Sequence, residues 1–196
     1  MKQHLVWVLS LCLMAAVAVA QEMPEMTAEE KAAMEAWMKA GAPGDPHKAL
    51  SPMVGSFDVK MTMWHAPDTP GEEITATSES RWVLEGRWVE QKFKGSVMGM
   101  PYEGLGYTGY DNMAGQYVGT WMDSMSTYVM TMTGKASPDG KKFSFSGMMP
   151  DPALGKSVPL DDEIVVVSPN RFESRMYSVT PDGKRYKMME FIYTRK

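Results

Sequence analysis

Apolar and polar residues alternate along most of the chain after residue 53. In the first such segment Phe57, Val59, Met61 and Met63 are apolar, and the residues between them are polar. A period of two is typical of a strand with one buried face and one solvated face. Nine further segments have strand patterns: 74–85, 87–97, 102–110, 116–122, 127–134, 142–148, 162–168, 172–180 and 184–195. We therefore expect ten strands.

Short turn sequences separate these segments. Examples are residues 111–115 (DNMAG), 137–140 (SPDG), 168–170 (SPN) and 180–183 (TPDG). Their Gly, Pro, Asn and Asp residues favour tight hairpin connections. Ten strands joined by hairpins favour an antiparallel up-and-down barrel, because closure removes exposed strand edges. The pattern thus predicts an all-β fold, and barrels of about eight or more strands can enclose a small ligand.

One short helix is expected before the barrel. Thr27 is a good N-cap, and Glu30 stands three residues later, which makes a capping box. Ala, Met, Glu and Lys dominate up to Ala40, and Gly41 ends the segment. We divide the chain into a leader (1–20), a lead with helix and linker (21–52) and the barrel (53–196).

The leader has the features of a secretory signal peptide. Lys2 is followed by an uncharged apolar run at 5–17 (LVWVLSLCLMAAV) and by Ala18-Val19-Ala20. Signal peptidase cleaves the chain after a leader that has a short basic start, an apolar stretch and a small-x-small end. We predict cleavage after Ala20 and an extracytoplasmic location, periplasmic or secreted, without stable membrane insertion.

Charge and cysteine content narrow the function classes. Without residues 1–20 the chain has 19 Lys and Arg against 24 Asp and Glu, a net charge of −5. Mild acidity without a basic cluster argues against nucleic acid as a partner. The single cysteine, Cys12, lies in the leader, so neither disulfides nor a thiol nucleophile are expected.

Methionine replaces the usual aliphatic residues. Residues 21–196 contain 19 Met but 5 Leu and 3 Ile. Methionine is unbranched and polarisable, so it suits a pliable apolar pocket. Its thioether also suits Cu(I).

Several short motifs occur in a characteristic order. They are residues 54–57 (VGSF), 61–64 (MTMW), 81–88 (RWVLEGRW), 99–104 (GMPYEG), 109–112 (GYDN), 120–127 (TWMDSMST) and 189–195 (MEFIYTR). In this order, residues 45–196 resemble the bacterial domain-of-unknown-function family 1579. The resemblance implies an uncharacterised secreted barrel that is lipocalin-like or nitrobindin-like. It implies no activity and supplies no catalytic residues.

From these patterns we expect a small apolar molecule or a lipid to bind inside the barrel. Arg87 would hold an anionic group of the ligand. Asp123 shares a strand face with Trp121 by period two, and if that face is inward the Asp123 carboxylate needs a partner such as Arg81 or Arg87. The expected ligand-binding residues are Trp82, Arg87, Trp121, Asp123, Met176, Met188 and Tyr193.

Two other functions stay open. Met61, Met63 and His65 occupy every second position of one expected strand and therefore point the same way. Two thioethers and one imidazole suit Cu(I), so these residues are the candidate copper site. A structural or stress-related barrel without a ligand is the other alternative. Nucleophile elbows, P-loops and zinc-protease signatures are missing from the sequence, which favours a role without catalysis.

Overall fold

The computed structural model describes residues 26–196. These residues divide into two units: the first ends at Ala36, and the second covers Trp37–Lys196. Helix α1 (Ala28–Gly41) begins at the predicted capping box. The Thr27 N–H donates to the Glu30 carboxylate at 2.7 Å, and the Glu30 N–H donates to the Thr27 hydroxyl at 3.2 Å. No helix among the described residues is long and apolar enough to cross a membrane. The predicted signal peptide lies outside these residues.

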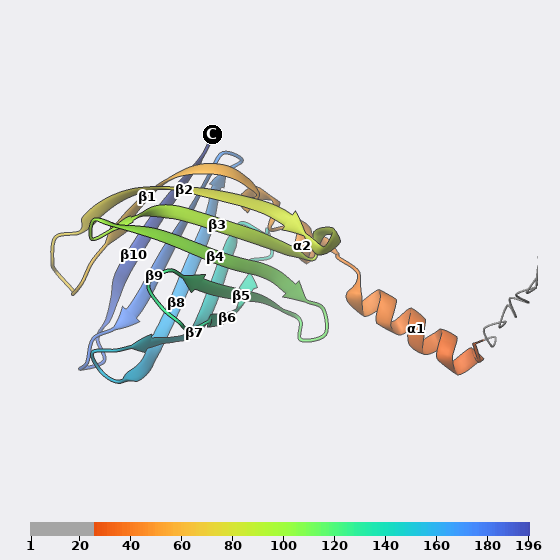
Figure 1. Ribbon diagram of the computed structural model, residues 1–196. Coiled ribbons are helices and arrows are strands. Elements are labelled where there is room, and N and C mark those ends of the chain that lie inside the picture. The colour runs from red at the N-terminus through yellow and green to blue at the C-terminus, as the bar shows by residue number, and fades with distance from the viewer. Residues whose placement is uncertain (1–25) are drawn as a thin grey trace, which may run out of the picture. The chain divides into compact units, whose positions relative to one another are not determined.

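Ten strands form one closed barrel (Figure 1). They are β1 (Gly55–Met63), β2 (Glu72–Val83), β3 (Trp88–Val97), β4 (Met100–Asp111), β5 (Gln116–Asp123), β6 (Met130–Ala136), β7 (Lys142–Asp151), β8 (Lys156–Ser168), β9 (Arg171–Val179) and β10 (Arg185–Arg195). Each strand pairs antiparallel with its neighbours in the chain, and β10 closes the barrel on β1, with Phe57 opposite Arg195. The predicted ten-stranded antiparallel up-and-down barrel is confirmed.

The alternation in the sequence decides which side chains face inward. In β1, Phe57, Val59 and Met61 are at most 5% exposed, whereas the polar residues between them are exposed. Aromatic side chains of different strands then pack edge to face inside the barrel, as Phe57 of β1 does on Phe172 of β9 with ring centres 5.2 Å apart. The core therefore lies along the barrel axis, as period-two patterns require.

Strand β8 begins six residues before the predicted start at 162. Its first part contains Pro159, which lacks an N–H and usually marks an edge strand or a break. The ladder between β8 and β9 starts only at Asp161, so Pro159 pairs with β7 alone, opposite Met148. The side of Pro159 that faces β9 has no backbone pairing at this point, so the missing N–H removes no backbone hydrogen bond between strands.

A short segment closes one end of the barrel. Helix α2 (Asp45–Lys48) and the 3-10 turn η1 (Ser51–Met53) bring Leu50 and Met53 over the core, where they are 0% and 8% exposed. His47 is buried as well and accepts a hydrogen bond from the Gly44 N–H at 3.0 Å. We call residues 44–53 the plug.

Hydrogen bonds from the barrel hold the plug in place. The Tyr117 hydroxyl donates to the Pro46 carbonyl at 2.9 Å. The Arg195 guanidinium donates to the carbonyls of Val54 and Pro52 at 2.7 and 3.1 Å. The bonds from Arg195 join β10 to the chain just before β1, and the bond from Tyr117 joins β5 to the plug. Together they fix the plug at its end of the barrel.

Candidate functional site

The barrel encloses a cavity of about 280 Å3 that is lined by side chains from all ten strands and by two plug residues. Most of the lining is apolar and soft. Eight methionines contribute: Met53, Met61, Met63, Met130, Met132, Met149, Met176 and Met189. Eight aromatic residues contribute as well: Phe93, Tyr102, Trp121, Tyr128, Phe145, Phe172, Phe191 and Tyr193. The interior therefore contains space, although it carries many large side chains.

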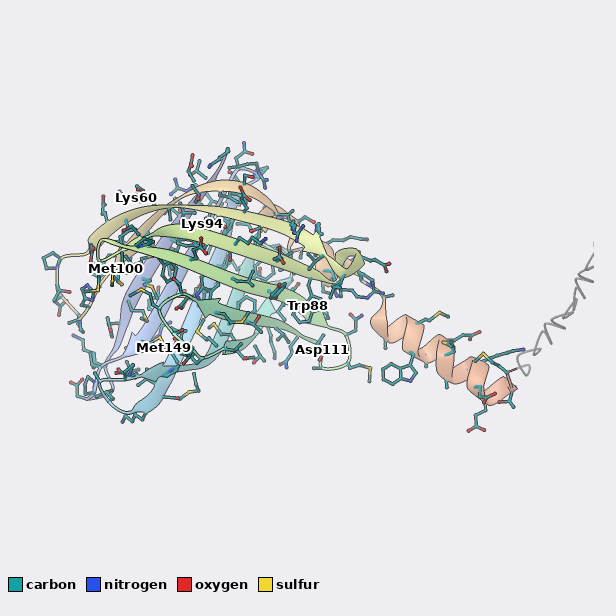
Figure 2. The ribbon with its side chains drawn as sticks, in the orientation of Figure 1. Lys60, Trp88, Lys94, Met100, Asp111 and Met149 are labelled. Carbon is teal, nitrogen blue, oxygen red and sulfur yellow. The ribbon has the colours of Figure 1, made fainter. Side chains whose placement is uncertain are left out.

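Burial of the lining changes from one end of the cavity to the other. Leu50 of the plug and Phe172, near the start of β9 at the plug end, are at most 4% exposed. Lining residues at the opposite strand ends, such as Met63, Val97 and Met149, are partly exposed. Figure 2 marks the two ends of β4 by Met100 and Asp111, and the partly exposed residues belong to the end of Met100. We call this end the mouth.

Two glycines of β4 make room for the indole of Trp121. A Cβ atom at Gly104 would stand 2.1 Å from the Trp121 ring, and one at Gly106 would stand 2.8 Å from it. Both distances are far shorter than a carbon contact allows, so the ring lies flat against these backbones. The Trp121 Nε1–H donates to the Tyr102 hydroxyl at 3.1 Å. The glycines thus set the position of the largest aromatic group in the wall.

A carboxyl group stands in the middle of this apolar wall. Asp162 lies on the inward face of β8 and is 8% exposed. The hydroxyl of Ser174, on β9, donates to its Oδ1 at 2.6 Å. No Lys, Arg or His of residues 26–196 forms an ion pair with Asp162. Burial without a cation raises the pKa of Asp162 to about 7, although the bond from Ser174 opposes this.

A second polar group, Gln91 on β3, lines the same cavity. The Gln91 amide donates to the Ser78 hydroxyl at 3.0 Å and to the Tyr193 hydroxyl at 3.4 Å. Burial raises the pKa of Tyr193, and the nearby Asp162 carboxylate adds to this, so the phenol stays protonated. Tyr193 can therefore donate a hydrogen bond within the cavity.

Another carboxylate, Asp123, lies at the mouth. It ends β5 and lines the cavity next to Tyr102 and Tyr128. Its Oδ1 accepts the Met125 N–H at 3.0 Å. Burial raises the pKa of Tyr102 and of Tyr128, and the charge of Asp123 raises both further.

Four of the seven expected ligand-binding residues line the cavity: Trp121, Asp123, Met176 and Tyr193. Trp121 and Asp123, which were expected to share one face of their strand, both line the cavity. Neither Arg81 nor Arg87 stands beside Asp123. Arg81 instead pairs with Glu90, Nε to Oε1 at 2.9 Å, on the outer side of the barrel.

The other three expected residues lie elsewhere, each for a local reason. Trp82 packs against the core without lining the cavity. Arg87 follows the 3-10 turn η2 (Leu84–Gly86) and donates to the Gly41 carbonyl at 2.9 Å, so its charge serves the turn region. Met188 falls in a β-bulge of β10, which shifts the alternation and places Met189 in the wall instead.

The three residues considered for Cu(I) do not come together in the cavity. Met61 and Met63 line it. Strand β1 ends at Met63, so the period of two does not reach His65, whose side chain is 62% exposed and stands 3.6 Å from Glu72. Within residues 26–196, no cluster of three or more His, Cys, Asp or Glu could hold a metal ion.

Sequence reasoning missed the central polar groups, Asp162, Ser174 and Gln91. Asp162 stood at the expected start of β8, where an acidic residue indicates a turn. The inward alternation of Val158, Leu160, Asp162 and Ile164 would have placed it in the wall.

Comparisons with solved structures agree with the fold. The crystal structure of Rv2717c from M. tuberculosis is 14% identical, covers 79% of this chain and 99% of its own, and has a TM-score of 0.60. EF1p2_mFAP2b bound to DFHBI is 12% identical over 76% of this chain and 98% of its own, with a TM-score of 0.42. A redesigned β barrel, b11L5F_LGL, is 17% identical over 76% and 95%, with a TM-score of 0.38. At these identities the likeness to Rv2717c shows the fold alone.

No curated protein matches the chain. A family described as "Protein of unknown function (DUF1579)" matches residues 42–195, which contain the plug and all ten strands. The order of motifs noted in the sequence agrees with this match, and so does the barrel. The chain therefore belongs to the DUF1579 family of proteins of unknown function.

Proposed function

We propose that this protein is exported and binds one small, mostly apolar molecule inside its barrel. The observation that carries the proposal is the cavity of about 280 Å3 with Met and aromatic walls. Ligand sites in proteins are mostly apolar, contain few polar groups and measure about 300–1,000 Å3. The cavity lies just below this range, so it suits a compact molecule rather than a long lipid chain.

The wall chemistry favours such a ligand. Removing apolar surface from water contributes about 25 cal/mol per Å2. Methionine side chains adjust their shape at low energetic cost, so one cavity can fit ligands of slightly different outline. The plug closes one end, which excludes water from the deep part of the site and leaves the mouth as the route of entry.

A filling variant tests this proposal. Gly119 lines the cavity, and a Cβ atom there would meet nothing closer than 3.9 Å. Gly119→Leu should therefore fill the space without disturbing the strand. The matched control is Thr133→Leu, which adds the same side chain to an exposed position of neighbouring β6.

The probe is 1-naphthalenemethanol, and its binding is followed by calorimetry. We expect saturable binding with one site in the wild type and in the Thr133→Leu variant, and loss of binding in Gly119→Leu. Equal binding in all three proteins would place the probe outside the barrel and contradict the proposal. Absence of binding in the wild type would favour a barrel that holds no ligand.

A further inference from the structure

The charges that line the cavity are all of one sign. Its two ionisable carboxyl groups are Asp123 at the mouth and Asp162 in the middle. Among the described residues of the wall there is no Lys, Arg or His. A ligand that enters therefore meets one carboxylate at the mouth and a second one deeper in the barrel.

Asp162 lacks a partner for its charge. The only hydrogen bond that its carboxyl group receives from residues 26–196 is the one from Ser174. Across the strand pairs it faces Phe145 on β7 and Met176 on β9, which are both apolar. The ionisable groups near it are the phenol of Tyr193 on β10 and the adjacent Glu163, which offer no positive charge. A buried charge without a counter-charge is costly, so an ammonium group placed here would be strongly stabilised.

The remaining wall suits the rest of such a molecule. Aromatic rings attract cations through their π faces, and methionine sulfur is polarisable. Phe93, Trp121, Phe191 and Tyr193 surround the same space as Asp162. Asp123 adds negative potential at the mouth, which favours the approach of a cation.

We propose that the ligand is a small organic cation, an aromatic or aliphatic amine whose ammonium group pairs with Asp162 while its apolar part lies against the Met and aromatic walls. This inference rests on the proposed function, because it needs the cavity to be a binding site. The sequence led us to expect the cationic Arg87 as the polar anchor, whereas here the anchor is the anionic Asp162.

Three probes of one shape test the charge preference: 1-naphthylmethylamine, 1-naphthalenemethanol and 1-naphthoate. They are titrated by calorimetry at about pH 8, where the amine is protonated and Asp162 is ionised. We expect the amine to bind about tenfold or more tightly than the alcohol, and the carboxylate to bind most weakly. Asp162→Asn keeps the size of the side chain and should abolish the preference for the amine while it retains binding of the alcohol.

Asp161→Asn is the matched control. Asp161 precedes Asp162 but points outward, where it accepts a hydrogen bond from Ser146 at 2.9 Å, so its replacement should leave the preference unchanged. Equal affinity for amine and alcohol in the wild type would overturn the inference and leave the proposed binding function standing. If the wild type bound none of the three probes, both the inference and the proposed binding function would be overturned. Circular dichroism of the Asp162→Asn protein confirms that any change in affinity comes from a folded barrel.

Discussion

At the scale of the residue, the carboxyl group of Asp162 stands in an environment very different from water. Its side chain is buried in the barrel wall with one hydroxyl as partner. The pKa of Asp162 rises to about 7 because burial disfavours the carboxylate. The folded protein therefore binds this proton more tightly than the unfolded chain does.

This difference predicts how stability depends on pH. The contribution of Asp162 is fully present below its ordinary pKa near 3.8 and is lost as the pH rises through about 7. Between those values, the free energy of unfolding of the wild type should fall relative to Asp162→Asn by up to about 1.4 kcal/mol per pH unit. Urea unfolding of both proteins at about pH 4 and about pH 7 measures it. A difference between the two proteins that does not change with pH would contradict the prediction.

At the scale of the element, the plug is the part that makes the cavity a closed-ended site. Leu50 is fully buried and lines the cavity floor. Tyr117 and Arg195 hold the surrounding backbone by hydrogen bonds to its carbonyls. The plug should therefore contribute both stability and the shape of the deep end.

Leu50→Ala tests the plug. Truncation of a fully buried leucine should lower the free energy of unfolding by about 2–5 kcal/mol, because apolar contacts are lost and space is left behind. The control is Leu84→Ala in η2, where the leucine is 68% exposed, and there we expect a change within about 0.5 kcal/mol. Equal stability of the two variants in urea would show that the plug does not pack as described.

Elements were easier to predict than the site. The period of two gave all ten strands, since hydrophobic alternation directly encodes which face is buried. Pro159 hid the first part of β8, because whether a proline breaks a ladder depends on a neighbouring strand that the sequence does not reveal. The bulge at Met188 hid the inward position of Met189 in the same way. Arg87 was expected to anchor a ligand, but its guanidinium donates to the backbone carbonyls of Gly41 and Leu84, and such contacts cannot be read from the sequence.

At the scale of the whole molecule, stability rests on the core of the barrel and on its closure by β1 and β10. Residues 21–196 contain no cysteine, so no disulfide within them can stabilise the barrel. A ligand bound only to the folded state would add to that stability.

Export predicts a defined N-terminus. If the leader is cleaved after Ala20, the protein isolated from the periplasm or the medium begins at Gln21. Intact-mass spectrometry of the secreted protein measures this directly. A mass that still includes residues 1–20 in a membrane fraction would indicate a retained anchor instead.

The most direct test of the central claim, that the barrel interior is a binding site, is a crystal structure of the protein grown with 1-naphthylmethylamine. We expect density for one naphthyl group between Trp121 and Phe191, with its nitrogen within hydrogen-bond distance of Asp162. Density for the naphthyl group with the nitrogen away from Asp162 would keep the binding site and reject the cation. An interior filled by the protein's own side chains, with the amine absent or bound outside the barrel, would contradict the account.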